Sequence, residues 1–138
     1  MRAIFFQVRT AQDKVNRIAE AAQLHFFKKE HLLFLVEDDR ALQFIDNLLW
    51  SFPTESFLPH RIVSEKCDEK IAISKEKINF NGAKAVFNLC LTPLLLEAPL
   101  LYDFEDLSTP NKQMLSQVRF NAYKTAHFHI ESRTTLES

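Results

Sequence analysis

The sequence predicts an α/β domain whose sheet begins with parallel strands. Two apolar segments, residues 3–8 and 31–36, are rich in β-branched and aromatic residues, as in strands covered on both faces. The segment between them has helical spacing, so strand, helix and strand follow one another over about 36 residues, the size of a βαβ unit. The composition, with 46% apolar and 25% charged residues in 138, is that of one soluble globular domain, residues 1–138.

The first two predicted helices have start signals and apolar faces. Thr10 can cap the first helix together with Asp13, three residues later. Its predicted core face consists of Val15, Ile18, Ala19, Ala22 and Phe26. The second helix is expected to begin at Asp38 or Asp39 and to end before Pro53. Its predicted core face consists of Leu42, Ile45, Leu48 and Leu49.

The second half of the chain is predicted to contain short strands and one long helix. After an ordered loop at residues 53–59, strands are expected at residues 61–63, 70–74, 83–89 and 100–104. Asn81-Gly82 is the clear turn signal among them. Thr109-Pro110 opens the last helix with a capping residue and a proline at the first helical position. The predicted core face of this helix is Met114, Leu115, Val118 and Ala122.

Composition excludes several function classes. A net charge of -1 supplies no field for holding a polyanion, so strong direct binding of nucleic acid is not expected. A single glycine excludes Gly-rich phosphate loops and dinucleotide fingerprints. Cys67 and Cys90 have no metal-like spacing and are interpreted as free thiols in a reducing compartment. The apolar runs are too short for a signal peptide or a membrane span, so we expect a cytoplasmic protein.

Residues that could support catalysis are few. Glu37, Asp38 and Asp39 follow the second predicted strand, at the edge of α/β sheets where ligands usually bind. Three carboxylates could hold a metal ion there, but we favour capping of the next helix. His127 and His129 are close in sequence, yet a zinc site would need two further ligands. No serine or cysteine lies in a nucleophile motif, so we expect no catalytic residue, metal or cofactor.

Two features suggest protein binding. The segment from Trp50 to His60 places the chain's single tryptophan with Phe52 and Phe57 around a loop bracketed by prolines. Such aromatics either pack in a core or form a binding hot spot, and the sequence leaves both readings open. The second feature is a polar face of the last helix that also carries a phenylalanine and could receive an acidic peptide with an apolar end. It comprises Gln113, Gln117, Phe120 and Lys124, with Lys112 and Arg119 nearby.

At these two features the chain resembles the chi subunit family of bacterial DNA polymerase III. Residues 49–60, LWSFPTESFLPH, are similar to the family's LW-x-x-P-x-ESF-x-PH pattern. Residues 119–124, RFNAYK, are similar to its RY-x-AYR pattern near the C-terminus. The order of elements agrees as well: a first βαβ unit, an acidic turn, the Trp-Pro loop and a final helix.

The resemblance implies a three-layer α/β/α, Rossmann-like domain with a mostly parallel sheet and no nucleotide chemistry. It also implies a non-enzymatic adaptor that binds the psi subunit of the clamp loader, and through a second surface the acidic, Phe-terminated tail of single-stranded-DNA-binding protein. By position, Trp50 and Phe57 would face psi. The tail-binding residues would be Gln113, Gln117, Phe120, Asn121 and Ser132.

The tail-binding positions depart from the family pattern. Gln113, Gln117 and Asn121 stand where well-studied relatives have basic residues, and each neutral replacement forfeits roughly 1 kcal/mol of a charge-assisted contact. Tail binding is therefore expected to be weaker, shifted toward Arg119, Lys112 and Lys124, or absent. Two alternatives stay open: an adaptor for another client, such as a helicase, through the Trp50 surface, and a metal- or nucleotide-binding enzyme that uses residues 37–39.

Overall fold

The computed structural model describes residues 1–51 and 58–136. Seven strands form one sheet in the order β3-β4-β2-β5-β6-β1-β7, and all six pairings are parallel. The strands are β1 (Arg2–Val8), β2 (Leu32–Leu35), β3 (Arg61–Ile62), β4 (Ile71–Ser74), β5 (Ala85–Asn88), β6 (Leu100–Asp106) and β7 (His129–Arg133). The helices are α1 (Ala11–Phe27), α2 (Asp39–Ser51) and α3 (Pro110–Thr125).

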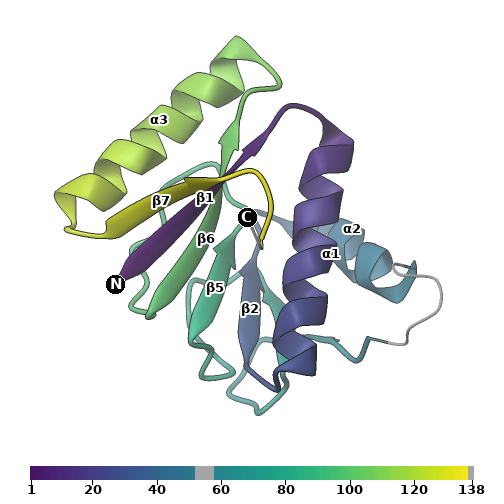
Figure 1. The fold of residues 1–138 in the computed structure, drawn as a ribbon. Helices are drawn as coiled ribbons and strands as arrows, with labels where there is room; N and C mark the ends of the chain where they lie inside the picture. Colours follow the sequence, from purple (N-terminus) through teal and green to yellow (C-terminus); the bar gives the residue numbers. More distant parts are fainter. Residues whose placement is uncertain (52–57, 137–138) are drawn as a thin grey trace.

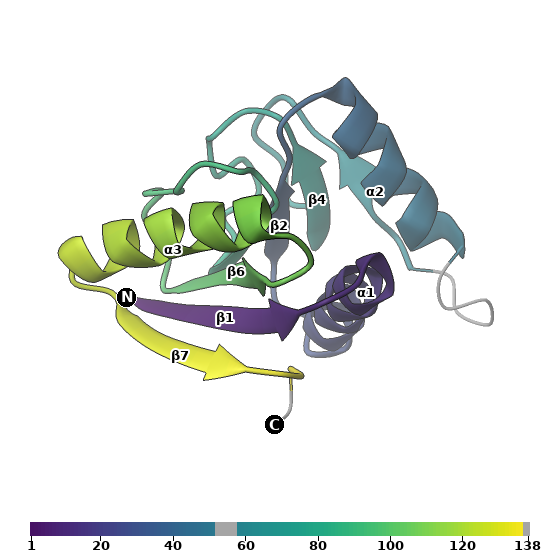
Figure 2. The same cartoon turned by 90° about the horizontal axis from the view of Figure 1, so that it is seen from above.

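Helices cover both faces of the sheet, which confirms the three-layer α/β/α architecture. Helices α1 and α2 lie on one face, whereas α3 lies on the other, above the half of the sheet formed by β6, β1 and β7 (Figures 1 and 2). Since all strands are parallel, their carboxyl ends meet at one edge of the sheet. This is the edge at which ligands bind in open α/β sheets.

The face covered by α1 and α2 contains the aromatic part of the core. Phe87 contacts Phe6, Phe34, Tyr102 and Phe104, with ring centroids 5.2–6.1 Å apart. The predicted apolar faces of the first two helices are confirmed, because Ile18, Ala22, Ile45 and Leu49 are buried in this cluster. The predicted start signals are confirmed too. The Thr10 hydroxyl accepts a hydrogen bond from the Asp13 N–H (3.1 Å), while the Asp13 carboxylate accepts one from the Thr10 N–H.

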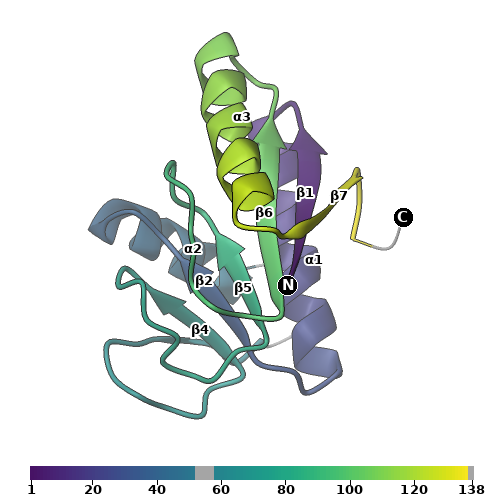
Figure 3. The same ribbon diagram turned by 90° about the vertical axis from the view of Figure 1, so that its left-hand side faces the viewer.

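The opposite face is covered by α3 over one half and by connecting segments over the other. Loops following β3, β4 and β5 insert Val63, Phe80, Ala83 and Leu94 against the buried side chains of β2, β4 and β5. Figure 3 shows the connection after β5 running beside α3. Parallel strands β4, β5 and β6 are thus joined without helices, although the sheet remains covered on both faces.

The predicted core face of the last helix is wrong for Met114 and Val118, whereas its other two members, Leu115 and Ala122, are half-buried. Met114 and Val118 are 58% and 52% exposed, whereas Ser116, Arg119 and Tyr123 are buried. The start of the helix is as predicted: the Thr109 hydroxyl accepts a hydrogen bond from the Lys112 N–H, and Pro110 is the first helical residue. The helix is therefore rotated about its axis relative to the expectation, because polar partners in the sheet fix its orientation.

The chain also contains one strand that the sequence reading missed. β7 pairs in parallel with β1 at the edge of the sheet, with Phe5 opposite Ser132. Between α3 and β7, His127 adopts a left-handed conformation (φ 67°), and the Phe128 N–H donates to the Tyr123 carbonyl. This is a Schellman cap, in which glycine is the usual residue. In a chain with one glycine, a histidine takes that position.

Candidate functional site

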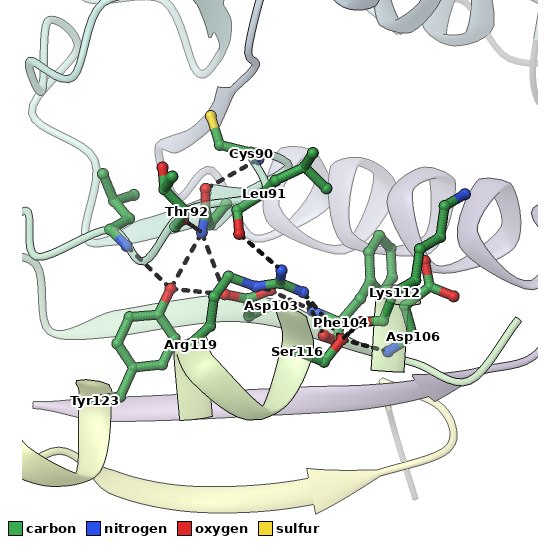
Figure 4. A network of polar contacts seen from close by, with 12 residues as sticks. Cys90, Leu91, Thr92, Asp103, Phe104, Asp106, Lys112, Ser116, Arg119 and Tyr123 are labelled. Carbon is green, nitrogen blue, oxygen red and sulfur yellow. Dashed lines mark hydrogen bonds and ion pairs between the residues drawn. The ribbon is translucent and has the colours of Figure 1, made fainter. Parts of the chain in front are cut away.

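A buried polar network holds α3 against the sheet (Figure 4). At its centre lies Asp103, in the middle of β6, whose carboxylate accepts hydrogen bonds from Arg119 Nε (3.1 Å), the Tyr123 hydroxyl (2.6 Å) and Asn88 Nδ2 (3.2 Å). Burial raises the pKa of Asp103, while Arg119 and the Tyr123 hydroxyl oppose that rise. Burial and the adjacent Asp103 carboxylate both raise the pKa of Tyr123, which keeps its hydroxyl a donor.

Arg119 is committed to this network rather than to the surface. The residue is 4% exposed, and besides Asp103 its side chain donates to the carbonyls of Leu91 (3.0 Å) and Phe104 (3.0 Å). A further bond reaches the Ser116 hydroxyl (3.2 Å). The expectation that Arg119 supplies charge to an acidic peptide is therefore corrected, since its guanidinium already neutralises a buried carboxylate. Strand β6 signals this in the sequence, because a charged residue within an apolar strand requires a cation from a neighbouring element.

The remaining residues of the predicted peptide surface lie on the outer side of α3 and beside it. Gln113, Gln117, Asn121 and Lys124 are exposed, and Gln117 donates a hydrogen bond to the Asn121 side chain (3.2 Å). Phe120 is partly buried and packs edge-on against Phe5 of β1, with ring centroids 5.5 Å apart.

Ser132 is exposed on β7, opposite Phe5 in the sheet register. The structure therefore brings Phe120 and Ser132 to the same residue of β1. It leaves Lys112, which is exposed in the first turn of α3, at the far end of the helix from Lys124.

Trp50 lies at the end of α2 and is 53% exposed. Its ring packs against the imidazole of His60, with centroids 4.5 Å apart and the two planes tilted by 56°. His60 is fixed in turn, because its Nε2 lies 3.0 Å from an Asp46 carboxylate oxygen and its Nδ1 lies 2.8 Å from the Leu58 carbonyl. Of the two readings of the aromatic loop, core packing is wrong for Trp50. Phe52 and Phe57 lie outside the described residues.

The acidic turn after β2 serves local structure. Asp38 accepts a hydrogen bond from the Ala41 N–H (2.9 Å), which is the expected cap of α2, and Asp39 pairs with Lys75 (2.6 Å). Within residues 1–51 and 58–136, no three His, Cys, Asp or Glu side chains are placed to hold a metal ion. His127 and His129 are exposed at the end of α3 and the start of β7, where His127 takes the left-handed position just after the helix cap, Ala126.

Comparison with known proteins identifies the family of the chain. The model of the DNA polymerase III chi subunit family, HolC, matches residues 1–131. The chain belongs to the DNA polymerase III chi subunit family. A search of curated proteins found no match.

Family membership assigns the chain an accessory role in the DNA polymerase III complex. The match covers every strand of the sheet except the last two residues of β7, so it includes α3, the buried network and Trp50. For a chi-family chain, Arg119 and Tyr123 in the second motif are explained by their contacts with Asp103, because they orient α3. Among the described helices, none is long and apolar enough to cross a membrane.

Proposed function

We propose that this chi-family chain is a non-enzymatic adaptor, which links the psi subunit of the clamp loader to the C-terminal tail of single-stranded-DNA-binding protein. The family match over residues 1–131 is the observation that carries this proposal. The buried network supports it: Asp103, Arg119 and Tyr123 satisfy one another inside the protein and serve to position α3. The chain's own role is then to present surfaces.

The psi-binding surface is proposed at Trp50 and Phe57. Trp50 exposes about half of its surface to solvent, and its ring packs against His60, which two hydrogen-bond contacts hold in place. A rigid, half-exposed tryptophan is the kind of residue that dominates binding energy at interfaces, because little side-chain entropy remains to be lost. Phe57 is included in this surface only because of its position in the family's first motif.

Replacement of Trp50 by alanine tests the psi surface. We expect Trp50→Ala to weaken psi binding about 30-fold or more, as at an interface hot spot of about 2 kcal/mol. Because the ring is half exposed, the free energy of unfolding should fall by less than about 1 kcal/mol. Met114→Ala, which removes an equally exposed apolar side chain from α3, is the matched control. Undiminished psi binding by a folded Trp50→Ala protein would contradict this surface.

The tail-binding surface is proposed on the outer side of α3, at Gln113, Gln117, Phe120, Asn121, Lys124 and Ser132. Phe120, Phe5 and Ser132 supply the apolar and polar floor between α3 and β7. With Arg119 buried, Lys124 and Lys112 are the cations that remain on this helix, so binding should be modest and salt-sensitive.

Fluorescence anisotropy with a labelled acidic peptide ending in phenylalanine tests the tail surface. Gln117→Arg should tighten binding at low salt two- to fivefold, since a partly exposed ion pair contributes about 0.2–1 kcal/mol. Ser64→Arg adds the same charge on a loop after β3 and should change nothing. If neither the wild type nor Gln117→Arg binds the peptide, the tail is not a partner of this face.

The adaptor is expected to bind single-stranded DNA poorly by itself. Its net charge is -1, and its two exposed cations on α3 do not alternate with aromatic side chains. Micromolar or tighter binding of the protein alone to a DNA oligonucleotide at physiological salt would show that contact with DNA is direct rather than relayed.

A further inference from the structure

A pocket of about 480 Å³ lies at the carboxyl-terminal edge of the sheet, away from Trp50 and from the outer side of α3. The ends of β2, β5 and β6 form its floor, and the first turns of α1, α2 and α3 surround it. Its volume falls in the range of small-molecule sites, about 300–1,000 Å³, and its position is the usual ligand position in open α/β sheets. Trp50 and the six residues proposed for the tail surface do not line it; Lys112, one of the two exposed cations of α3, does.

The walls of the pocket are mainly apolar. Val15 and Ile18 come from α1, Phe44 and Ile45 from α2, and Phe104 from β6. Phe44 stands at the rim with 57% of its surface exposed, whereas the next residue of the same helix, Ile45, is buried. An aromatic ring packed against Phe44 would remove its exposed surface from water, with the buried Phe104 beneath.

The acidic groups of the pocket are already neutralised or bonded inside the protein. Asp103 is held by Arg119 and Tyr123, and Asp106 pairs with Lys14 and accepts bonds from Ser108. Asp38 caps α2. At Asp103 and Asp106 a cationic ligand would have to displace an internal cation, whereas Asp38 is exposed and its capping bond uses one carboxylate oxygen.

Two cations at the mouth have no such partner. Within the described residues, the side chains of Arg40 and Lys112 form neither an ion pair nor a hydrogen bond, and both are exposed. They come from the first turns of two different helices, α2 and α3, and line the same pocket. The pocket thus combines an apolar interior with positive charge at its entrance, a combination that is complementary to an anion with an apolar body.

We propose that this pocket binds an aromatic carboxylate, with the ring among Val15, Phe44 and Phe104 and the carboxylate at Arg40 and Lys112. A nucleotide is a poorer fit, because the pocket contains no glycine through which a backbone could approach several phosphates. Binding is noncovalent: burial raises the pKa of the Cys90 thiol to about 12, so it is not a nucleophile at neutral pH.

Two sources supply this chemistry: a free aromatic acid, or the last residue of a protein chain that ends in an aromatic side chain. The second source would place the tail of the proposed function in this pocket rather than on the outer side of α3, and in that respect alone the inference rests on the proposed function.

Binding of N-acetyl-L-phenylalanine, followed by NMR chemical shifts and compared with N-acetyl-L-phenylalaninamide, tests the proposal. The acid should bind at least about fivefold more tightly than the amide, because only the acid carries the charge. Arg40→Gln and Lys112→Gln should each weaken the acid about two- to fivefold and leave the amide unchanged. Lys124→Gln removes an exposed cation from the other end of α3 and is the control.

Val15→Trp, which fills the interior, should abolish binding of both probes, and Phe44→Ala at the exposed rim provides the same test without a change in the core. Equal affinity for acid and amide, no binding of the acid up to about 10 mM, or binding unaffected by both variants would overturn the proposal. Tighter binding of adenosine monophosphate than of the aromatic acid would overturn it as well.

Competition separates the two sources. An acidic peptide ending in phenylalanine displaces the N-acetyl-L-phenylalanine if the chain end is the ligand, and binds alongside it if the free acid is. Suppose that the peptide binds Val15→Trp but not Lys124→Gln, and that the aromatic acid does not bind at all. This result would overturn the proposal that the pocket binds an aromatic carboxylate, while leaving the adaptor function intact. If no variant binds the peptide but the aromatic acid still binds, the tail-binding part of the proposed function fails and the pocket proposal stands.

Discussion

Replacement of Arg119 by methionine should be strongly destabilising, because it leaves the Asp103 carboxylate buried without its cation. The guanidinium makes four hydrogen bonds, to Asp103 (3.1 Å), the Leu91 and Phe104 carbonyls (3.0 Å each) and the Ser116 hydroxyl (3.2 Å). Removal of one member of a buried ion pair typically costs 3–5 kcal/mol, about 10–20 °C in Tm for a domain of this size. Thermal and urea unfolding at pH 7 measure both values.

The pH dependence identifies the cause of this loss. Burial raises the pKa of Asp103 and Arg119 opposes that rise, so Arg119→Met should raise this pKa further. A carboxyl whose pKa is higher in the folded than in the unfolded protein binds more protons when folded, which favours folding as the pH falls. The stability difference between wild type and Arg119→Met should therefore shrink as the pH falls from 7 toward the ordinary carboxyl range.

Two further variants complete the Arg119 experiment. Lys124→Met removes an exposed cation from the same helix and should change the free energy of unfolding by no more than about 0.5 kcal/mol. Asp103→Asn combined with Arg119→Met removes both charges and should be more stable than Arg119→Met alone. If Arg119→Met costs less than about 1 kcal/mol, or the second replacement restores nothing, the pair does not determine how α3 docks.

Two titratable groups in the core give further predictions. The Nε2 of His25 lies 2.8 Å from the Tyr102 hydroxyl, and burial lowers the pKa of this histidine. The folded protein therefore binds fewer protons at His25 than the unfolded chain does, so the free energy of unfolding decreases as the pH falls through 6.5. Unfolding at pH 7.5 and 5.0 should show a smaller loss for His25→Gln than for wild type; equal losses would contradict this. With a pKa of about 12, native Cys90 should react with iodoacetamide at pH 8 roughly a thousandfold more slowly than an unperturbed thiol, as peptide mass spectrometry can measure.

The local sequence pattern was sufficient to predict the helices in the first half of the chain. Helices α1 and α2 were predictable because their buried residues are apolar and recur at helical spacing, and because Thr10, Asp13 and Asp38 make the capping contacts that their positions indicate. The edge strand β7 was not predictable in the same way. Its sequence, HIESR, is mostly polar, and it is stabilised by pairing with β1, which lies more than 120 residues earlier in the chain.

The orientation of α3 required information from the sheet. Ranking by hydrophobicity places Met114 and Val118 inside and Arg119 outside, since arginine is almost never fully buried unless it is paired. The sequence contains a signal for the Asp103–Arg119 ion pair, because Asp103 interrupts an apolar strand. Tyr123 lies one helical turn after Arg119, so both can reach the same carboxylate.

The rotation of α3 also determines what an acidic partner meets on its outer side. The exposed side chains between the two lysines are amides and apolar groups, including Met114, Gln117 and Val118. Lys112 and Lys124 are twelve residues apart, about 18 Å along a helix, which exceeds the Debye length of about 8 Å at physiological salt. An extended peptide needs about six residues to span that distance, so neighbouring carboxylates at the end of one tail lie too close together to match the separation of the two lysines. Charge on this face therefore acts through single contacts, and most of the affinity for a peptide bound there has to come from burial of apolar surface.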